Sequence, residues 1–337
     1  MINNIKNCKK SNRNFYKITV IIVFIILAIS AFFISNVYGS MEISIKDIFT
    51  ILKHPNNLTP QGLVIWNVRI PRTIVGVLVG INLALSGAML QGVMRNPLAD
   101  PGIIGISSGA GLAGMIILII FPQYQYLVPP VAFVGAMGAA MMIYILAWKG
   151  GIQPMRVVLA GVAVSAILGA GISALMVFFS DRVHGAIMFM NGGLSARSWP
   201  QVYTILPYTM VGLVLAIIMS ERLNILVLGD DTARGLGLNV ELVRLEITAI
   251  AAMLAASAVS VVGLLGFVGL IIPHTTRLII GSDYKYLLPG SAFLGAAVVV
   301  FCDTFGRTIF APVEIPVGII MALLGAPFFL YLLRKQS

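Results

Sequence analysis

The chain has 337 residues, of which 59% are hydrophobic and only 10% charged, and its mean hydropathy is +0.99. Water-soluble domains carry about 25% charged residues, so this composition excludes a single soluble domain and indicates a chain immersed mainly in lipid. The net charge of +10 does not indicate a nucleic-acid partner, because basic residues in a membrane chain are explained first by its orientation.

The first predicted span, 18–35, is an uncharged apolar run that follows a basic N-terminal segment. A signal peptide would begin in the same way, but no small-residue cleavage site follows in 35–40, so we interpret the run as a membrane helix. At about 20 apolar residues for each span, the composition predicts about ten spans. Nine further apolar stretches bring the total to ten: 73–94, 103–121, 127–148, 157–179, 201–220, 245–264, 267–281, 287–302 and 316–333.

These stretches predict an all-α polytopic membrane protein with one transmembrane domain over residues 1–337. One long re-entrant element over 245–281 is an alternative to two short spans there. With the N-terminus in the cytoplasm, 15 of the Lys and Arg residues face inward and seven face outward, and the positive-inside rule favours this orientation. Both termini are therefore predicted to be cytoplasmic.

Small residues recur at four-residue spacing within the predicted spans. Gly76 with Gly80, and Gly105 with Gly109, predict close approach between helices, because small side chains on one face let membrane helices pack tightly. A longer stripe of small residues either packs in the same way or lines a path for a bulky solute. The stripe consists of Gly161, Ser165, Gly169 and Ser173.

Two connections on the predicted inner side have distinctive sequences. In 95–102, Pro97 and Pro101 prevent a helix from continuing, which indicates either a rigid, shaped loop or an ordinary reverse connection. In 221–244, we expect a short helix capped by Asp230 or Asp231 and ending at Gly235, followed by a second short helix from about Asn239. Two short helices on this face suggest a docking element, although a solvated loop would have a similar pattern.

Three arginines on the predicted outer side, Arg69, Arg72 and Arg307, oppose the positive-inside rule. A carboxylate on a protein partner would explain them, since the guanidinium forms bidentate contacts with carboxylates. The alternatives are snorkelling at the membrane interface and pairing with local acids such as Asp303 and Glu314.

The sequence lacks the residues that several functional classes of protein need. The two cysteines and three histidines are too scattered to predict a metal site or disulfide framework, and the sequence has no Walker motif for ATP and predicts no cofactor. An intramembrane protease is disfavoured, because Asp230 lies in a polar connection and His274 is the only histidine in a span. An ion-coupled secondary transporter would ordinarily need charged residues at mid-span, and here they lie at span ends. A purely structural membrane protein is a third class, and it predicts no dependence on an ATPase.

Seven ordered motifs carry a resemblance to a known family. The chain is similar, from about residue 60 to 335, to the FecCD permease subunits of bacterial ABC importers for iron-siderophores, haem and vitamin B12, which have the type II importer fold. The motifs are VRIPRTIVGVLVG (68–80), LSGAMLQGVMRNPLADPGIIGISSGAG (85–111), LAGVAVSA (159–166), MNGGLS (190–195), LGDDTARGLGL (228–238), GLLGFVGLIIPHTTRLIIGSDYKYLLPGSAFLGA (263–296) and EIPVGIIMALLGAPFFLYLL (314–333).

The resemblance implies a permease in the bacterial cell membrane that carries an iron-siderophore complex, with haem or cobalamin as alternatives. It implies a second permease subunit, identical or related, two cytoplasmic ATPase subunits, and an extracellular or periplasmic substrate-binding protein. By similarity, Arg69, Arg72 and Arg307 receive that binding protein, Asn96 and Leu98 form an inner constriction, and the span with the 161–173 stripe lines the path. The residues that resemble the ATPase-coupling element are Gly229, Asp230, Ala233, Arg234, Gly235 and Gly237.

Overall fold

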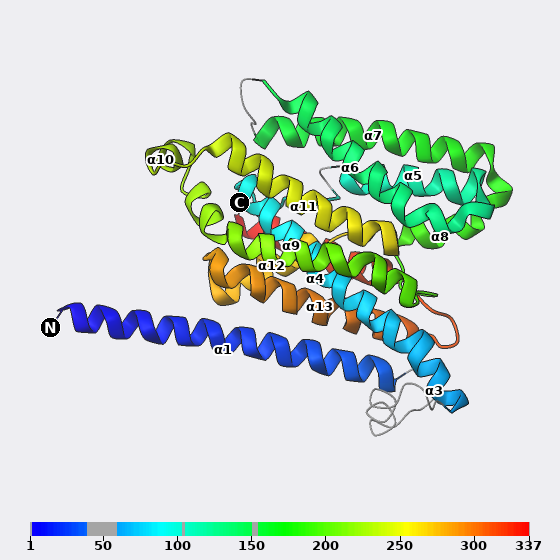
Figure 1. Ribbon diagram of the computed structural model, residues 1–337, viewed down its shortest axis with the longest axis horizontal. Coiled ribbons are helices and arrows are strands. Elements are labelled where there is room, and N and C mark those ends of the chain that lie inside the picture. The colour runs from blue at the N-terminus through cyan, green and yellow to red at the C-terminus, as the bar shows by residue number, and fades with distance from the viewer. Residues whose placement is uncertain (1, 39–58, 103–104, 150–153, 337) are drawn as a thin grey trace.

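The computed structural model describes residues 2–38, 59–102, 105–149 and 154–336, which form a bundle of helices (Figure 1). Each of the ten predicted spans lies on a helix. Within the described residues, seven helices are long and apolar enough to cross a membrane, and three shorter apolar helices accompany them. The prediction of an all-α membrane protein with about ten spans is therefore confirmed.

Ten helices match the predicted spans, and the other described elements are short helices at the ends of the bundle. The helices that match spans are α1 (Ile2–Val37), α4 (Ile70–Val93), α5 (Ile106–Ile120), α6 (Val128–Ala147), α7 (Pro154–Phe178), α9 (Trp199–Leu226), α11 (Val240–Val262), α12 (Val268–Ile280), α13 (Tyr284–Thr308) and α14 (Val317–Gln336). The short elements are α3 (Pro60–Val64), η1 (Ile65–Arg69), η2 (Pro122–Leu127), η3 (Ser180–Arg182), α8 (His184–Asn191) and α10 (Asp230–Gly235).

Helix α4 is the central element of the bundle. It is buried along most of its length and packs against α9, α11, α12 and α13. In Figure 1, α1 lies along one side of the bundle, and α5, α6 and α7 lie along the opposite side. Figure 1 also shows α10 and the N-terminus at one end and α3 and α8 at the other. Following the predicted orientation, we call the α10 end the inner end and the α8 end the outer end.

One glycine of each predicted small-residue pair lies at a close backbone contact between two helices. A Cβ atom added to Gly80 would lie 2.3 Å from the Gly295 carbonyl oxygen of α13, and one added to Gly109 would lie 2.4 Å from the Gly135 carbonyl oxygen of α6. Since real Cβ atoms do not approach backbone atoms so closely, these helices pack together only because the glycines have no side chains.

Gly80→Val should therefore separate α4 from α13 and prevent stable folding. Overpacked cores usually lose about 1–3 kcal/mol, and the backbone contact here puts the expected loss at the upper end or beyond. Fluorescence-detected size-exclusion chromatography of the detergent extract should show aggregated protein. Gly138→Val is the matched control, because a Cβ atom at Gly138 meets no atom within 4 Å. A monodisperse Gly80→Val protein would contradict the packing argument.

The region 245–281 forms two helices, as in the first of the two expectations. Helix α11 has 23 residues, whereas α12 has only 13 and begins directly after Phe267, a residue in the left-handed backbone region (φ 68°). At 1.5 Å per residue α12 is about 20 Å long, which is shorter than the roughly 30 Å hydrocarbon core. Helix α12 and the 15-residue α5 both begin after a residue in the left-handed backbone region, Phe267 for α12 and Gly105 (φ 84°) for α5.

Helix α8 was not predicted. The segment after it, Gly192–Gly193, joins three parts of the chain by backbone hydrogen bonds: Gly193 N donates to Val262 O, Leu264 N donates to Phe189 O, and Gly318 N donates to Gly192 O. The outer ends of α8, α11 and α14 are therefore held together by main-chain contacts. Residues 39–58, for which a helix over 41–53 would be expected from the apolar pattern, lie outside the described residues.

Candidate functional site

The predicted coupling element lies at the inner end, on α10. The helix begins after Gly229, whose φ of 113° suits glycine, so the expected side-chain cap by Asp230 or Asp231 is wrong. Both aspartates lie in the first turn, where negative charge is favourable. The helix ends at Gly235 as predicted, and Gly237 follows in the left-handed region (φ 82°).

The expected second short helix is also wrong. Asn239 does cap a helix, since its side chain accepts a hydrogen bond from Leu242 N, but that helix is the full span α11. Ala233 is fully buried and attaches α10 to the bundle, whereas Leu228 and Leu236 are each 62% exposed. Arg234 bonds to Glu241 at 2.6 Å, which joins α10 to the start of α11. The inner end thus has one short helix, α10, with an exposed leucine on either side of it in the chain.

Asp230 connects α10 to the loop that follows α4. Its Oδ1 atom accepts hydrogen bonds from Nη2 of Arg95 and from Nη2 of Arg244, both at 2.9 Å. Arg244 is buried in α11 with a side chain only 3% exposed, while Arg95 and Asp230 are 38% and 28% exposed. One carboxylate therefore ties α10 both to α11 and to the inner loop. Arg95 and Arg244 were not predicted as functional residues.

The predicted constriction residues lie on this same loop, immediately after Arg95. Asn96 Oδ1 accepts a hydrogen bond from Leu98 N at 2.9 Å, and Ala99 N donates to Asn96 O at 3.1 Å. Asn96 is exposed and Leu98 is partly exposed, whereas Asp100 is buried and accepts a hydrogen bond from Gly102 N at 2.7 Å. Local turns shape this loop, together with the bond from Arg95 to α10, and these bonds favour the expected shaped connection over an ordinary reverse connection.

The loop leads to the start of α12, where α4 supports the shortened helix. Pro273 has no N–H, so Gly269 O lacks the partner it would have in a regular helix. Gln91 Nε2 donates to Gly269 O at 3.2 Å and to Leu270 O at 3.3 Å, and Gln91 Oε1 accepts from Arg277 at 3.0 Å. A buried amide of α4 thus replaces the missing backbone donor.

Gln91→Leu should destabilise the folded chain by about 1–3 kcal/mol, because it leaves buried carbonyl oxygens of α12 without a donor. The cost should be smaller in the Pro273→Ala background, because the substituted residue regains a backbone N–H that can donate to Gly269 O. A double-mutant cycle measured by thermal unfolding in detergent checks this coupling. Strictly additive losses for the two substitutions would rule out the compensation.

The stripe of small residues on α7 changes its surroundings along the helix. Gly161 is buried and Ser165 is half-buried, and a Cβ atom added to Gly105 would lie 3.0 Å from Ser165 Oγ and 3.4 Å from Gly161 O. Gly169 would have open space beside an added Cβ atom, and Ser173 is exposed. The inner half of the stripe therefore packs beside the Gly105 turn, and only the outer half faces away from the described chain.

The predicted outer arginines form a buried network instead of an exposed cationic surface. Arg72 of α4 makes two hydrogen bonds to Asp303 of α13, at 2.9 and 2.8 Å, and a further one to Glu314 at 2.9 Å. The side chains of Arg72 and Asp303 are 9% and 3% exposed, and Glu314 is 42% exposed. The alternative of pairing with Asp303 and Glu314 is the one the structure shows for Arg72.

Arg69 and Arg307 bind the outer end of α1. Arg69 donates to Asn36 O at 2.8 Å and to Val37 O at 3.2 Å. Arg307 donates to Ser35 Oγ at 2.8 Å and also to Ser35 O, and lies 4.0 Å from Asp303. The three arginines thus hold α1, α4 and α13 together at their outer ends.

Glu314 links this network to the segment between α8 and α9, because Ser195 Oγ donates to its Oε2 at 2.8 Å. Burial alone would raise the pKa of Glu314, but the charge of Arg72 and the hydrogen bonds from Ser195 and Arg72 outweigh it, so the pKa lies below its usual value. Glu314 therefore stays ionised at neutral pH, with its exposed side beside Phe310 and Val313, which are 60% and 66% exposed.

The fold and these connections define a polytopic α-helical membrane permease. The chain belongs to the FecCD transport family, whose model matches residues 24–335. The match begins earlier than the resemblance from about residue 60 and includes most of the apolar part of α1.

Relatives in this family are named for different cargoes. The chain is 39% identical to the iron(III)-citrate import system permease protein YfmE of Bacillus subtilis, over 98% of both chains. It is 43% identical to the cobalamin import system permease protein BtuC of Halobacterium salinarum, over 82% of this chain and 74% of that one. It is 36% identical to the hemin transport system permease protein HmuU of Yersinia pestis, over 81% of this chain and 84% of that one.

A solved structure has the same fold. It is an inward-facing conformation of a metal-chelate type ABC transporter, with a TM-score of 0.83 and 28% identity, covering 94% of this chain and 99% of that chain. The chain is therefore the permease component of an ABC importer. Since the family is a permease family, ATP hydrolysis is expected in a separate subunit.

Proposed function

We propose that this permease carries a ferric chelate of the siderophore class across the cell membrane, and that ATP is hydrolysed by two cytoplasmic subunits that dock on α10. The relative named for iron(III)-citrate import supports this cargo over haem and cobalamin, because its similarity extends over 98% of both chains. Haem and cobalamin are the alternative cargoes of the same class of importer.

The observation that carries the mechanism is the link from α10 to the constriction loop. Asp230 lies on α10, the helix flanked by exposed leucines. Arg95, which bonds to Asp230, lies next to Asn96 and near Leu98. A displacement of α10 by a docked ATPase would therefore move Arg95 and, with it, the start of the constriction loop. In this proposal, Gly229 and Gly237 allow α10 to tilt, and Ala233 is the point at which it pivots on the bundle.

At the outer end, we propose that a substrate-binding protein docks over the loop between α13 and α14. Phe310 and Val313 are the most exposed of the large apolar residues there, and Glu314 is an exposed charged residue. Arg69, Arg72 and Arg307 contribute by holding this loop and the helix ends in position. A second permease subunit would complete the path, with the outer half of the α7 stripe, Gly169 and Ser173, facing it.

The cargo is tested by deleting the chain and restoring it from a plasmid while measuring uptake of radioactive iron chelates, labelled haem and labelled cobalamin. We expect deletion to abolish uptake of one ferric chelate and leave haem and cobalamin uptake unchanged. Loss of haem or cobalamin uptake with normal ferric chelate uptake would overturn the cargo assignment while leaving the importer class intact.

A further inference from the structure

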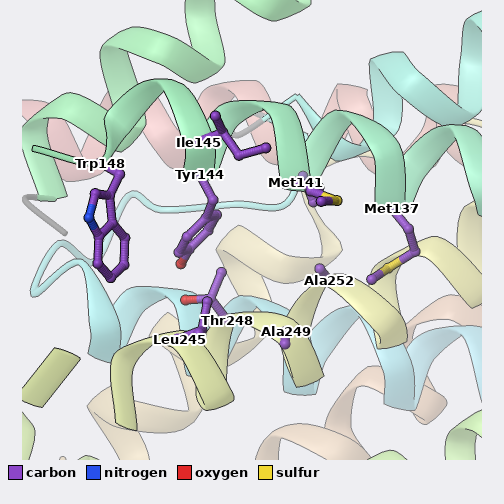
Figure 2. Close-up of a pocket in the computed structure, with 10 residues that line it drawn as sticks. Met137, Met141, Tyr144, Ile145, Trp148, Leu245, Thr248, Ala249 and Ala252 are labelled. Carbon is purple, nitrogen blue, oxygen red and sulfur yellow. The ribbon is translucent and has the colours of Figure 1, made fainter. Parts of the chain in front are cut away.

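A groove between α6 and α11 lies on the apolar surface of the bundle, apart from the inner and outer sites described above. It has a volume of about 560 Å³ and is lined almost entirely by apolar side chains (Figure 2). On its α6 side, the lining residues run from Met137 to Trp148, and on its α11 side from Leu245 to Ala252. The small residues Ala140, Ala249 and Ala252 leave this space between the two helices.

The length of the groove corresponds to one leaflet of a bilayer. Met137 and Trp148 are 11 positions apart on one helix, which corresponds to about 16 Å, or roughly half of the 30 Å hydrocarbon core. The groove is open to the outside of the bundle, since its lining residues Met141, Ile145 and Leu245 are 66%, 63% and 47% exposed. A groove of this kind lies among acyl chains and is shielded from water.

The polar groups of the lining lie toward the inner end of the groove. Their order along the groove matches the order of the ester and the headgroup in a phospholipid. Figure 2 shows the hydroxyl groups of Tyr144 and Thr248 pointing toward one another across the groove. Both oxygens are buried and lie close enough to interact with one another, and neither makes a further hydrogen bond among the described residues. One turn further along α6 is Trp148, a residue type favoured at the glycerol level of the membrane, followed by the exposed Lys149.

From these contacts, we propose that the groove binds one anionic glycerophospholipid of the inner leaflet. Its acyl chain lies along Met141, Met137 and Ala252. An ester carbonyl accepts hydrogen bonds from the hydroxyls of Tyr144 and Thr248, and the headgroup phosphate pairs with Lys149. An anionic lipid is favoured because the exposed Lys149 follows Trp148, the last lining residue on this side of the groove, and a cationic side chain near the membrane surface attracts anionic headgroups.

The test is native mass spectrometry of the full-length permease, purified in detergent and titrated with either palmitoyl-oleoyl phosphatidylglycerol or the matching phosphatidylcholine. We expect one retained phosphatidylglycerol for each chain and weaker retention of phosphatidylcholine. Ala249→Phe should abolish the bound lipid, because Ala249 is exposed in the groove and a ring there would occupy the acyl position. Val214→Phe is the matched control, on an exposed position of α9 outside the groove.

Lys149→Gln should remove the preference for phosphatidylglycerol while leaving phosphatidylcholine bound as before. The proposal would be overturned if Ala249→Phe retained the lipid as wild type does, if wild type bound both lipids equally, or if Ala249→Phe changed only the oligomeric state, which would make the groove an interface between copies of the chain. Size-exclusion chromatography of all variants confirms that each is folded, so loss of lipid is not mistaken for loss of structure.

Discussion

Arg95→Gln should reduce uptake on the order of tenfold while leaving the permease folded and the ATPase active. The pair with Asp230 is partly exposed, at 38% and 28%, and such pairs contribute only about 1 kcal/mol or less to stability. In the proposed mechanism, the substitution would nevertheless detach the loop 95–102 from α10. ATP would then be hydrolysed without moving the loop. Transport and ATP hydrolysis measured in the same reconstituted vesicles check this result.

Two variants serve as controls for that measurement. Arg95→Lys keeps the positive charge and should retain part of the transport. Arg222→Gln breaks a comparable exposed pair at the same end, Arg222 with Glu246 at 2.7 Å, without touching the loop. Equal losses in Arg95→Gln and Arg222→Gln, or normal transport in Arg95→Gln, would contradict a specific role for the link.

Arg72→Gln should destabilise the folded permease by about 3 kcal/mol or more, because it leaves a buried carboxylate without its main partner. Asp303, with a side chain 3% exposed, would then keep its longer contact with Arg307 at 4.0 Å. The thermal unfolding midpoint in detergent should fall, and the amount of protein in the membrane should fall with it. Glu314→Gln should have a small effect on stability, because Glu314 is 42% exposed.

This prediction separates a structural role of the outer arginines from direct docking. The double variant Arg72→Gln/Asp303→Asn should recover part of the stability, since it removes both charges together. If instead Arg72→Gln unfolds at the wild-type temperature and fails only to capture the substrate-binding protein, Arg72 contacts that partner directly. The unfolding midpoint and the capture assay should therefore be measured on the same preparations.

The helices were predictable from the sequence because lipid requires long apolar runs, and all ten predicted stretches lie on helices. The start of α11 was not predictable as part of a span, because the charged residues Glu241, Arg244 and Glu246 are typical of a solvated connection. In the structure, Arg244 is buried in the first turns of the span, and the carboxylate of Asp230 on α10 compensates its positive charge. Helix α8 was missed because eight residues are too few for a clear helical pattern.

The positions of the inner loop and of α10 were predictable from the sequence, but their contacts were not. The proline-rich inner loop and α10 were both identified from local signals, whereas the bond that joins them spans 135 positions in the sequence. The outer arginines were identified from their unusual charge, but hydropathy cannot tell an exposed guanidinium from one that Asp303 holds 231 positions away. Pairing over such distances depends on the packing of α4 against α11 and α13, which local sequence patterns do not describe.

In the proposed mechanism, the permease depends on a separate ATP-hydrolysing partner that acts through α10. This dependence is best checked by reconstituting the full-length chain into vesicles with and without that partner and measuring accumulation of a radioactive ferric chelate against its gradient. We predict accumulation only when the partner and ATP are both present. Accumulation in vesicles that contain the permease alone would contradict this dependence.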